Sequence, residues 1–429
     1  MASHQENLFD PPFKTSLEFG VGHYVPILKS LAGERRALEQ MAAGAPDARR
    51  RLTPLVEARD PIPQPPRERR VVANEFADEG DSDAWEDDDY EIAYEVEEGA
   101  GPARKKPSGP RNYLRGLPDQ LLPMIGKFSP FYLDFPTTPS DRLMTGRKSK
   151  GAPVNAIEYV YDACRARHLW FIPVLAVGAD DGRAALVRVA SQTDRRGVCL
   201  RLPLLATVYS DRRAGTLGVG DRVARMLAEL KASPGDVDLI LELRQLDPAG
   251  GVTAEFVARA FDEIANLKEF RNVILTGTSV PNTSAGLARG QITYIARQEW
   301  TLYTLLRKIS GRVPTFGDYG VQNPDGPKAG GIPIPNLRYT TTPDLLYSLG
   351  ENNDRDTFAE QFRRTCRQVI ESGRFRGEDY SLADLIIART PADRKPRVDQ
   401  GFWRGLGTLH HLTQVIEDLK QLDSEPATR

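Results

Sequence analysis

Charged and polar side chains occur late in most of the apolar runs of this chain, where they could take part in a reaction. An isolated charge in such a run costs free energy unless it is paired. Several of them on neighbouring strands therefore indicate a site. The residues at these positions are Lys29, Glu57, Asp134, Arg201, Glu242, Asp318 and Tyr319.

The carboxylates of this set predict two kinds of chemistry. Carboxylates from several strands can hold a hard cation such as Mg²⁺, and a single one can act as a general base. Asp318 and Glu242 are the first candidates for either role, and Glu57 and Lys29 are further catalytic candidates. The candidate metal ligands are Glu57, Asp134, Glu242 and Asp318.

Four arginines, at positions 201, 297, 338 and 376, could bind a phosphate or carboxylate group through paired N–H donors. A structural alternative is open for part of the set, because Glu57, Arg201 and Glu242 could equally form ion pairs inside the fold. Arg297 could likewise pair with Glu299 close by.

His410 and His411 are adjacent in a predicted helix, so their side chains point about 100° apart. They cannot hold one metal ion together, and at most one of them faces a given site. The alternative for each is a packing or capping role.

Strand-like runs alternate with helical runs along the chain, which predicts a closed (β/α)₈ barrel, with an open doubly wound sheet as the alternative. In such a barrel the functional residues lie at the carboxyl ends of the strands. Gly317 and Gly320 would permit a sharp exit from the last strand and set Asp318 at the mouth of the barrel. The predicted strands are 23–30, 51–60, 130–138, 169–179, 197–205, 236–247, 271–281 and 312–323.

The later part of the chain is predicted to be mostly helical. We expect a helix, in one or two pieces, over 288–309, and a strand followed by a helix over 336–350. Further helices are expected over 356–373 and 408–422, with a polar, mobile stretch at 388–403. The predicted organisation is an N-terminal arm (1–20), a barrel (21–323) with an insertion at 61–112, and a C-terminal extension (324–429) packed on the barrel.

Composition excludes several classes of protein. The chain has 429 residues, of which 40% are hydrophobic and 27% charged, as in an ordinary soluble globular protein. No run is long and apolar enough to span a membrane, and the start does not read as a signal peptide. The three cysteines are far apart, which argues against a disulfide framework and for the cytoplasm. Dinucleotide-binding, P-loop, HExxH and GxSxG motifs are absent.

An acidic run dominates the predicted insertion. Residues 75–98 include 13 acidic residues and no basic one, so without them the formal net charge of −2 becomes +11. A basic body could attract phosphates or nucleic acid. The run reads either as a solvated linker or as a strip that docks on a partner or on this basic surface through its aromatic residues. These aromatic residues are Phe76, Trp85, Tyr90 and Tyr94.

Several short motifs occur together and in order: HYVPILKSLAGERRAL, LTPLVEA, VDLILEL, ILTGTSVP, RQEWTLY, PTFGDYG and FWRGLGTLHHL. In these the chain resembles the bacterial and phage "beta family protein" group, over about residues 23–412. The resemblance implies a functionally uncharacterised protein of phages and variable bacterial regions, and a role in phage–host conflict is one hypothesis for such a protein. The motif positions include Lys29, Glu57, Arg201, Glu242, Arg297, Glu299, Trp300, Asp318, Tyr319, Arg338, Tyr339, Arg376, Trp403, Arg404, His410 and His411.

Three hypotheses on function follow. In the first, the chain is a metal-assisted enzyme acting on a phosphate-containing or nucleic-acid substrate, with Arg201, Arg297 and Arg338 holding anionic oxygens. In the second, it is a binding or sensor protein without catalysis, and in the third a structural assembly component. The substrate-binding candidates are Arg201, Arg297, Glu299, Tyr319, Arg338, Tyr339, Arg376 and His410.

Overall fold

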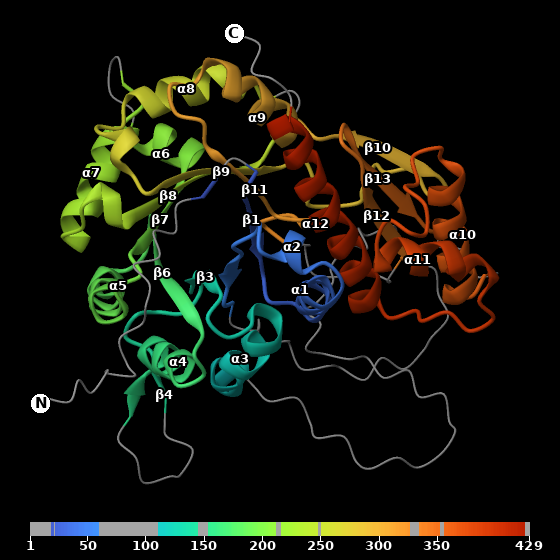
Figure 1. Cartoon of the computed structure of the whole chain (residues 1–429), viewed down its shortest axis with the longest axis horizontal. Helices are drawn as coiled ribbons and strands as arrows, with labels where there is room; N and C mark the ends of the chain where they lie inside the picture. Colours follow the sequence, from blue (N-terminus) through green and yellow to red (C-terminus); the bar gives the residue numbers. More distant parts are fainter. Residues whose placement is uncertain are drawn as a thin grey trace, which may run out of the picture.

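Eight parallel strands close into a barrel in this chain (Figure 1). Each strand pairs with the next in sequence, and β1 pairs with both β2 and β11, which closes the sheet and excludes the open alternative. The computed structural model describes residues 19–20, 22–59, 110–144, 153–211, 216–247, 250–326, 334–351 and 356–424. The barrel strands are β1 (Tyr24–Leu28), β2 (Leu55–Glu57), β3 (Pro130–Asp134), β6 (Trp170–Ala176), β7 (Val198–Pro203), β8 (Val237–Gln245), β9 (Asn272–Thr278) and β11 (Thr315–Asp318).

Helices surround the barrel, and the (β/α)₈ prediction is confirmed. The ring consists of α1 (Ala32–Gly44), α3 (Pro110–Ile125), α4 (Ala156–Arg165), α5 (Asp181–Asp194), α7 (Val219–Leu230), α8 (Ala254–Asp262), α9 (Gln298–Ile309) and α12 (Gln400–Ser424). Shorter elements connect them: α2 (Pro46–Arg49), β4 (Leu143–Met144), β5 (Val154–Asn155), α6 (Leu204–Asp211), η1 (Pro234–Asp236) and η2 (Leu267–Glu269).

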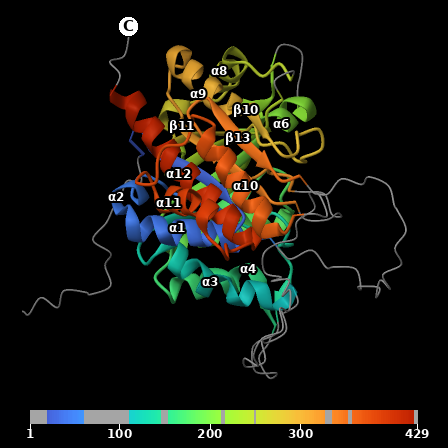
Figure 2. The ribbon, with the colours of Figure 1, turned by 90° about the vertical axis from the view of Figure 1, so that its right-hand side faces the viewer.

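An accessory unit lies beside the barrel. Its antiparallel sheet has the order β10–β13–β12, with β10 (Ile292–Ala296), β12 (Asn336–Thr340) and β13 (Asp344–Leu349). Its helices are α10 (Phe358–Glu371) and α11 (Leu382–Arg389), followed by η3 (Thr390–Ala392). Figure 2 shows α10 and α11 in front of the barrel, next to α12.

The final helix belongs to the barrel ring although it is separated from the last barrel strand by the accessory unit. Helix α12 packs against α1, β1 and β12. Close approach to α1 requires glycine, because a Cβ on Gly33 would lie 2.4 Å from the carbonyl oxygen of Gly401 and 2.8 Å from the amide nitrogen of Gly405. The chain after residue 323 therefore divides between the accessory unit and the ring.

Two predicted helices of this region are wrong. The first half of the predicted 288–309 helix is the strand β10, since Ile292, Thr293, Tyr294 and Ile295 favour the extended chain and pair with β13. The helix predicted after the strand at 336 is β13, the central strand of the accessory sheet. A short apolar run reads alike for a buried strand and a buried helix, so periodicity alone could not separate them.

The polar stretch 388–403 is more regular than predicted. It contains the end of α11, the turn η3 and the first turn of α12, which begins at Gln400 and not near Thr408. Gly401 lowers the helix propensity of this turn, and its packing against Gly33 of α1 favours the helix there. The acidic run 75–98 and most of the predicted insertion lie outside the described residues.

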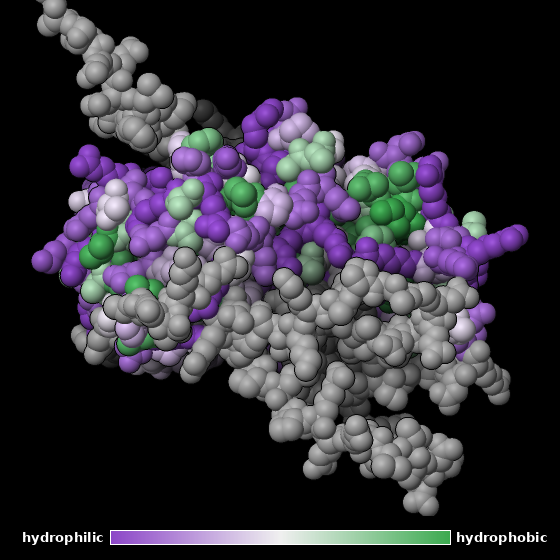
Figure 3. Space-filling view, turned by 90° about the horizontal axis from the view of Figure 1, so that it is seen from below, coloured by the Kyte–Doolittle hydropathy of each residue, from purple (hydrophilic) through white to green (hydrophobic). Residues whose placement is uncertain are grey.

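Polar groups also occur at the opposite end of the barrel, where strands β8 and β9 begin. Asp238 accepts hydrogen bonds from Tyr132 (2.9 Å), from Asn272 (2.7 Å) and from the Arg271 guanidinium (2.8 Å to Nε). On the described part of the face seen from below in Figure 3, hydrophilic groups dominate and hydrophobic groups form small separate patches. Among the described residues, no helix is long and apolar enough to cross a membrane.

Candidate active site at the barrel mouth

Arg201 is the centre of a buried charged cluster at the carboxyl ends of the strands. Its Nη1 lies 2.7 Å from Glu57 Oε1 and 2.8 Å from Asp134 Oδ2. Its Nε and Nη2 donate to the two carboxylate oxygens of Glu242 at 3.1 and 2.9 Å. Only 5% of Arg201 is exposed. The structure thus brings together residues of β2, β3, β7 and β8, and we call them the mouth cluster.

Period-two alternation explains why these residues meet. Glu57 and Asp134 are direct partners across the β2–β3 pair, and Arg201 and Glu242 follow the inward-facing Cys199 and Ile240 by two residues. Side chains two residues apart on a strand share a face. The inner face of the barrel is therefore apolar in its middle and charged at its mouth.

The carboxyl groups of the mouth cluster differ in acidity. Burial raises the pKa of Asp134 above its ordinary value, and although Arg201 opposes this, the nearby Glu57 adds to the rise. Burial acts in the same direction on Glu57, but Arg201 and Arg59 outweigh it, so the pKa of Glu57 is lowered. Environments that push neighbouring pKa values apart are typical of an acid and a base.

Tyr319, the residue that follows β11, adds a phenol to the mouth cluster. Its hydroxyl donates a hydrogen bond to Glu242 Oε1, and its ring belongs to the inner apolar layer of the barrel. Burial and the Glu242 carboxylate raise the pKa of this phenol well above its ordinary value. Tyr319 is therefore a neutral donor at neutral pH.

Three further cations border the mouth cluster. Arg59 lies 2.7 Å from Glu57 Oε2, and Arg244 lies 3.6 Å from Glu242 Oε1 and also pairs with Asp325. The Lys29 ammonium donates to the carbonyl oxygen of Asn323 at 2.5 Å. These cations face the carboxylates of the cluster and Asp325, and they are the groups at the border with which an anionic ligand would interact.

The four candidate magnesium ligands do not form one set. The guanidinium of Arg201 lies among Glu57, Asp134 and Glu242 and occupies the central position that a cation would need. Asp318 is elsewhere, as described next. Among the residues that the structure describes, no group of three or more His, Cys, Asp or Glu side chains is arranged to hold a metal ion.

Asp318 does not lie at the mouth, because its side chain faces outward, toward α12. It accepts a hydrogen bond from the Tyr24 hydroxyl and lies 2.9 Å from His411 Nε2. Neighbouring residues on a strand point to opposite faces, so Tyr319 points in where Asp318 points out. Gly320 makes the predicted turn, with φ of +58°, whereas Gly317 lies within β11.

The two histidines of α12 face different carboxylates. His411 links Asp318 to Thr340, whose Oγ1 lies 2.8 Å from Nδ1. His410 has Nε2 2.7 Å from the Thr340 carbonyl oxygen and Nδ1 3.0 Å from Asp384 Oδ2. Both ring nitrogens of His410 are therefore engaged by protein oxygens, which indicates a structural role and not a substrate ligand.

Arg297 and Glu299 are also structural contacts. Arg297 is 2% exposed; its Nη1 donates to the Thr341 carbonyl oxygen and to Asp418, both at 2.9 Å. Glu299 accepts a hydrogen bond from Ser279 at 2.6 Å and lies 3.5 Å from Arg297 Nε. These contacts hold the start of α9 to α12, away from the mouth cluster.

The remaining substrate-binding candidates lie in or near the accessory unit. Arg338 donates to the Val321 carbonyl oxygen at 2.5 Å. The Tyr339 hydroxyl donates to Asp384 at 2.7 Å, and its ring stacks on His410. Arg376 is exposed, with its guanidinium 4.5 Å from the centre of the Tyr380 ring.

Sequence reasoning missed Glu34. Its Oε2 accepts hydrogen bonds from the backbone N–H groups of Lys29 and Leu31 at 2.8 and 3.1 Å. Its Oε1 is buried and has no hydrogen-bond partner in the described part of the chain. Burial raises its pKa to about 7. Glutamate is common in the first turn of a helix, so the sequence offers no signal that distinguishes Glu34. Only the burial of its side chain in the fold does so.

One comparison with known proteins identifies a family. A family model described as "Beta protein" matches residues 24–417, which includes the barrel strands and most of α12. No curated protein and no solved structure matches the chain.

Proposed function

This chain belongs to the Beta protein family, and we propose that it is an enzyme that acts on a phosphate-bearing substrate at the mouth of its barrel. The mouth cluster is the observation that carries the proposal. Acid and base groups of unequal pKa converge there from several strands, at the end of the barrel where such folds catalyse.

Each part of the cluster has a role in the proposed reaction. Asp134, with its raised pKa, gives a proton to the leaving oxygen as the attacking water forms its bond to phosphorus, and it takes up the proton that this water releases. Arg201 stabilises negative charge that develops on the substrate, held in place by Glu57 and Glu242. The border cations Lys29, Arg59 and Arg244 attract the anionic substrate.

Nucleotides and nucleic acids are the substrates we place first, because they carry the required phosphate. The three cysteines are unpaired, which supports a cytoplasmic location as part of the same proposal. The phage–host context that the family resemblance implies is consistent with a nucleic-acid substrate.

The test compares Asp134→Asn with Asp119→Asn, an exposed carboxylate on α3. Purified variants are assayed for release of phosphate or nitrophenol from phosphate mono- and diesters, nucleotides, and short DNA and RNA. We expect wild type and Asp119→Asn to turn over the same substrate, and Asp134→Asn to lose about 10²–10⁴-fold in rate, as for a lost general acid. Full activity in Asp134→Asn would refute the role of Asp134.

A second candidate is a barrel that binds its ligand without catalysis, as a sensor in phage–host conflict. It is favoured by one observation: every nitrogen of Arg201 is already engaged by a buried carboxylate. A closed network of this kind can be purely structural. A ligand that raises the melting temperature but is never turned over, even by wild type, would favour this candidate.

A further inference from the structure

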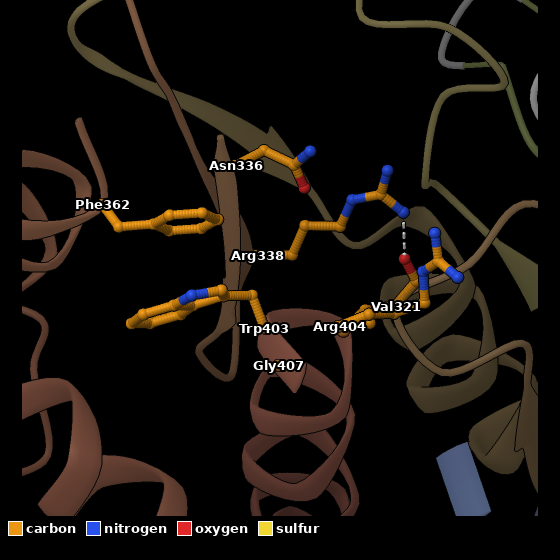
Figure 4. Close-up of a pocket in the computed structure, with 7 residues that line it drawn as sticks. All are labelled: Val321, Asn336, Arg338, Phe362, Trp403, Arg404 and Gly407. Carbon is orange, nitrogen blue, oxygen red and sulfur yellow. Dashed lines mark hydrogen bonds between the residues drawn. The ribbon is translucent and has the colours of Figure 1, made fainter. Parts of the chain in front are cut away.

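A small pocket lies where the barrel meets the accessory unit, and the mouth cluster contributes none of its lining residues. Its volume is about 30 Å³, and it is partly enclosed. Since a water-sized group needs about 10–15 Å³, the pocket has room for two or three oxygen atoms. It is lined by Val321, Asn336, Arg338, Phe362, Trp403, Arg404 and Gly407 (Figure 4).

Two guanidinium groups determine the charge of this pocket. Arg338 comes from β12 and Arg404 from α12, and their side chains project in the same direction in Figure 4. No acidic side chain is among the described lining residues, although the buried Glu34 carboxylate interacts electrostatically with Arg404. Positive charge from two elements therefore converges on a space of oxyanion size.

One N–H donor of Arg338, its Nε, is not used by a described protein acceptor in this pocket. Its Nη1 donates to the Val321 carbonyl oxygen at 2.5 Å, and its Nη2 donates to the Tyr347 hydroxyl at 2.8 Å. Its Nε is buried and has no hydrogen-bond partner among the residues that the structure describes. A buried N–H without an acceptor costs free energy, so the guanidinium is held in place by protein contacts but lacks one acceptor.

Close packing of α12 against β12 brings the two arginines together. A Cβ on Gly407 would lie 2.9 Å from the Arg338 carbonyl oxygen, so glycine permits α12 to lie directly against β12. On the other side, the rings of Phe362 and Trp403 stack with centroids 4.5 Å apart, and the Trp403 indole donates to the Arg397 carbonyl oxygen. These aromatic rings form a rigid apolar wall.

We propose that this pocket binds an oxyanion, the carboxylate or phosphate group of a small ligand, between Arg338 and Arg404. The anion would supply the acceptor that Arg338 Nε lacks and would interact with the guanidinium of Arg404. Paired N–H donors of arginine suit either oxyanion. This binding site does not depend on the mouth cluster being catalytic.

The test measures binding of inorganic phosphate and of acetate to the full chain, by calorimetry and by melting temperature, with chloride at equal ionic strength as the reference. The variants are Arg338→Met, Arg404→Met and the conservative Arg404→Lys. The matched control is Arg374→Met, an exposed arginine outside the pocket. Asp134→Asn serves as the mouth control.

We expect one of the two anions to bind wild type, Arg374→Met and Asp134→Asn alike. Binding should weaken about tenfold or more in Arg404→Met and in Arg338→Met, as for a lost charge-assisted hydrogen bond, and Arg404→Lys should recover part of it. Arg338→Met also loses the contacts with Val321 and Tyr347 and could fail to fold. In that case Arg404→Met still tests the proposal. The preferred anion identifies the ligand as a phosphate or a carboxylate.

Two results would overturn the proposal. One is equal stabilisation by phosphate, acetate and chloride, and the other is anion binding that is unchanged in Arg404→Met and Arg404→Lys. Binding lost in Asp134→Asn but kept in Arg404→Met would place the anion at the mouth, which would support the proposed enzyme and refute the pocket. Loss of turnover in Asp134→Asn with intact anion binding would separate the two sites.

Discussion

At the scale of single residues, the barrel contains several ionisable groups that are buried and paired across long stretches of chain. Tyr24 and Asp318 are 294 residues apart in sequence and hydrogen-bonded in the fold. Removing one member of such a pair leaves the other buried and unsatisfied, which costs far more than losing an exposed ion pair. The same burial determines how these groups titrate.

Asp318→Asn should lower the free energy of unfolding by about 3–5 kcal/mol at pH 7, because it removes the charged partner of His411. Asp162→Asn, which breaks an exposed pair with Arg165, should change it by less than about 0.5 kcal/mol. Urea unfolding measures both. Equal effects would show that the buried pair contributes no more than a surface pair.

The same carboxylate predicts a pH dependence. Burial raises the pKa of Asp318, but the opposing effects of His411, Tyr24 and the Gly320 N–H outweigh it, so the pKa is lowered in the folded state. A lowered acid pKa adds stability above the unfolded value of about 3.9, and this is lost as pH falls through the folded value. Below about pH 4 the stability difference between wild type and Asp318→Asn should therefore shrink, as measured by urea unfolding across pH.

Glu34 predicts a change of stability with pH that is opposite in sign to that of Asp318. Burial raises its pKa from 4.5 to about 7, so between these values the folded state binds more protons than the unfolded state and loses stability as pH rises. As pH rises from 4.5 to 8, the free energy of unfolding of Glu34→Gln should therefore increase by about 3 kcal/mol relative to that of wild type. Glu39→Gln, on the same helix, is the control variant. Parallel stability curves for wild type and Glu34→Gln would contradict this.

At the scale of elements, glycines decide how closely α12 approaches its neighbours. Gly33 on α1 faces backbone atoms of Gly401 and Gly405, which cannot move aside as a flexible side chain could. Gly407 has the same relation to β12. These contacts place α12 so that His411 reaches Asp318 and Arg404 reaches the pocket.

Gly33→Ala should therefore destabilise the protein by about 1–3 kcal/mol through overpacking. Gly44→Ala is the matched control, because it lies in the same helix with no atom within 4 Å of the added Cβ. Higher helix propensity should make that variant more stable by up to about 1 kcal/mol. Thermal unfolding of both variants checks this, and a stabilised Gly33→Ala would contradict it.

At the scale of the whole molecule, the barrel and the accessory unit share α12. The helix covers β1 and α1 on the barrel side and contacts β12 and α11 on the other. Neither part can expose this face without uncovering apolar core that contains Leu406, Leu412 and Val415. We therefore expect one cooperative unfolding transition for the two parts.

Removal of residues 400–429 should abolish cooperative folding, because β1 and α1 would lose their cover. Calorimetry and urea unfolding of the truncated chain test this. A sharp transition in the truncated chain would show that the barrel is complete without α12.

Much of the fold was predictable from local pattern. Apolar runs with β-branched residues alternate with amphipathic runs, and a parallel barrel is the arrangement that buries both. Glu57, Asp134, Arg201 and Glu242 could be placed at the mouth for the same reason, since each ends an apolar run. The predicted helices at 288–309 and after 336 failed in part because a short apolar run does not distinguish a buried strand from a helix.

Local hydrophobic pattern was enough to predict the barrel, the order of its strands and the residue types at its mouth. The face that each side chain takes and the partner that it meets depend on packing between elements that are far apart in the sequence. Successive residues at the end of β11 point to opposite sides of the sheet. Tyr319 therefore contacts the mouth cluster inside the barrel, while Asp318 contacts His411 outside it. Partners such as Arg338 and Arg404 come from separate elements, and only packing brings them to one pocket.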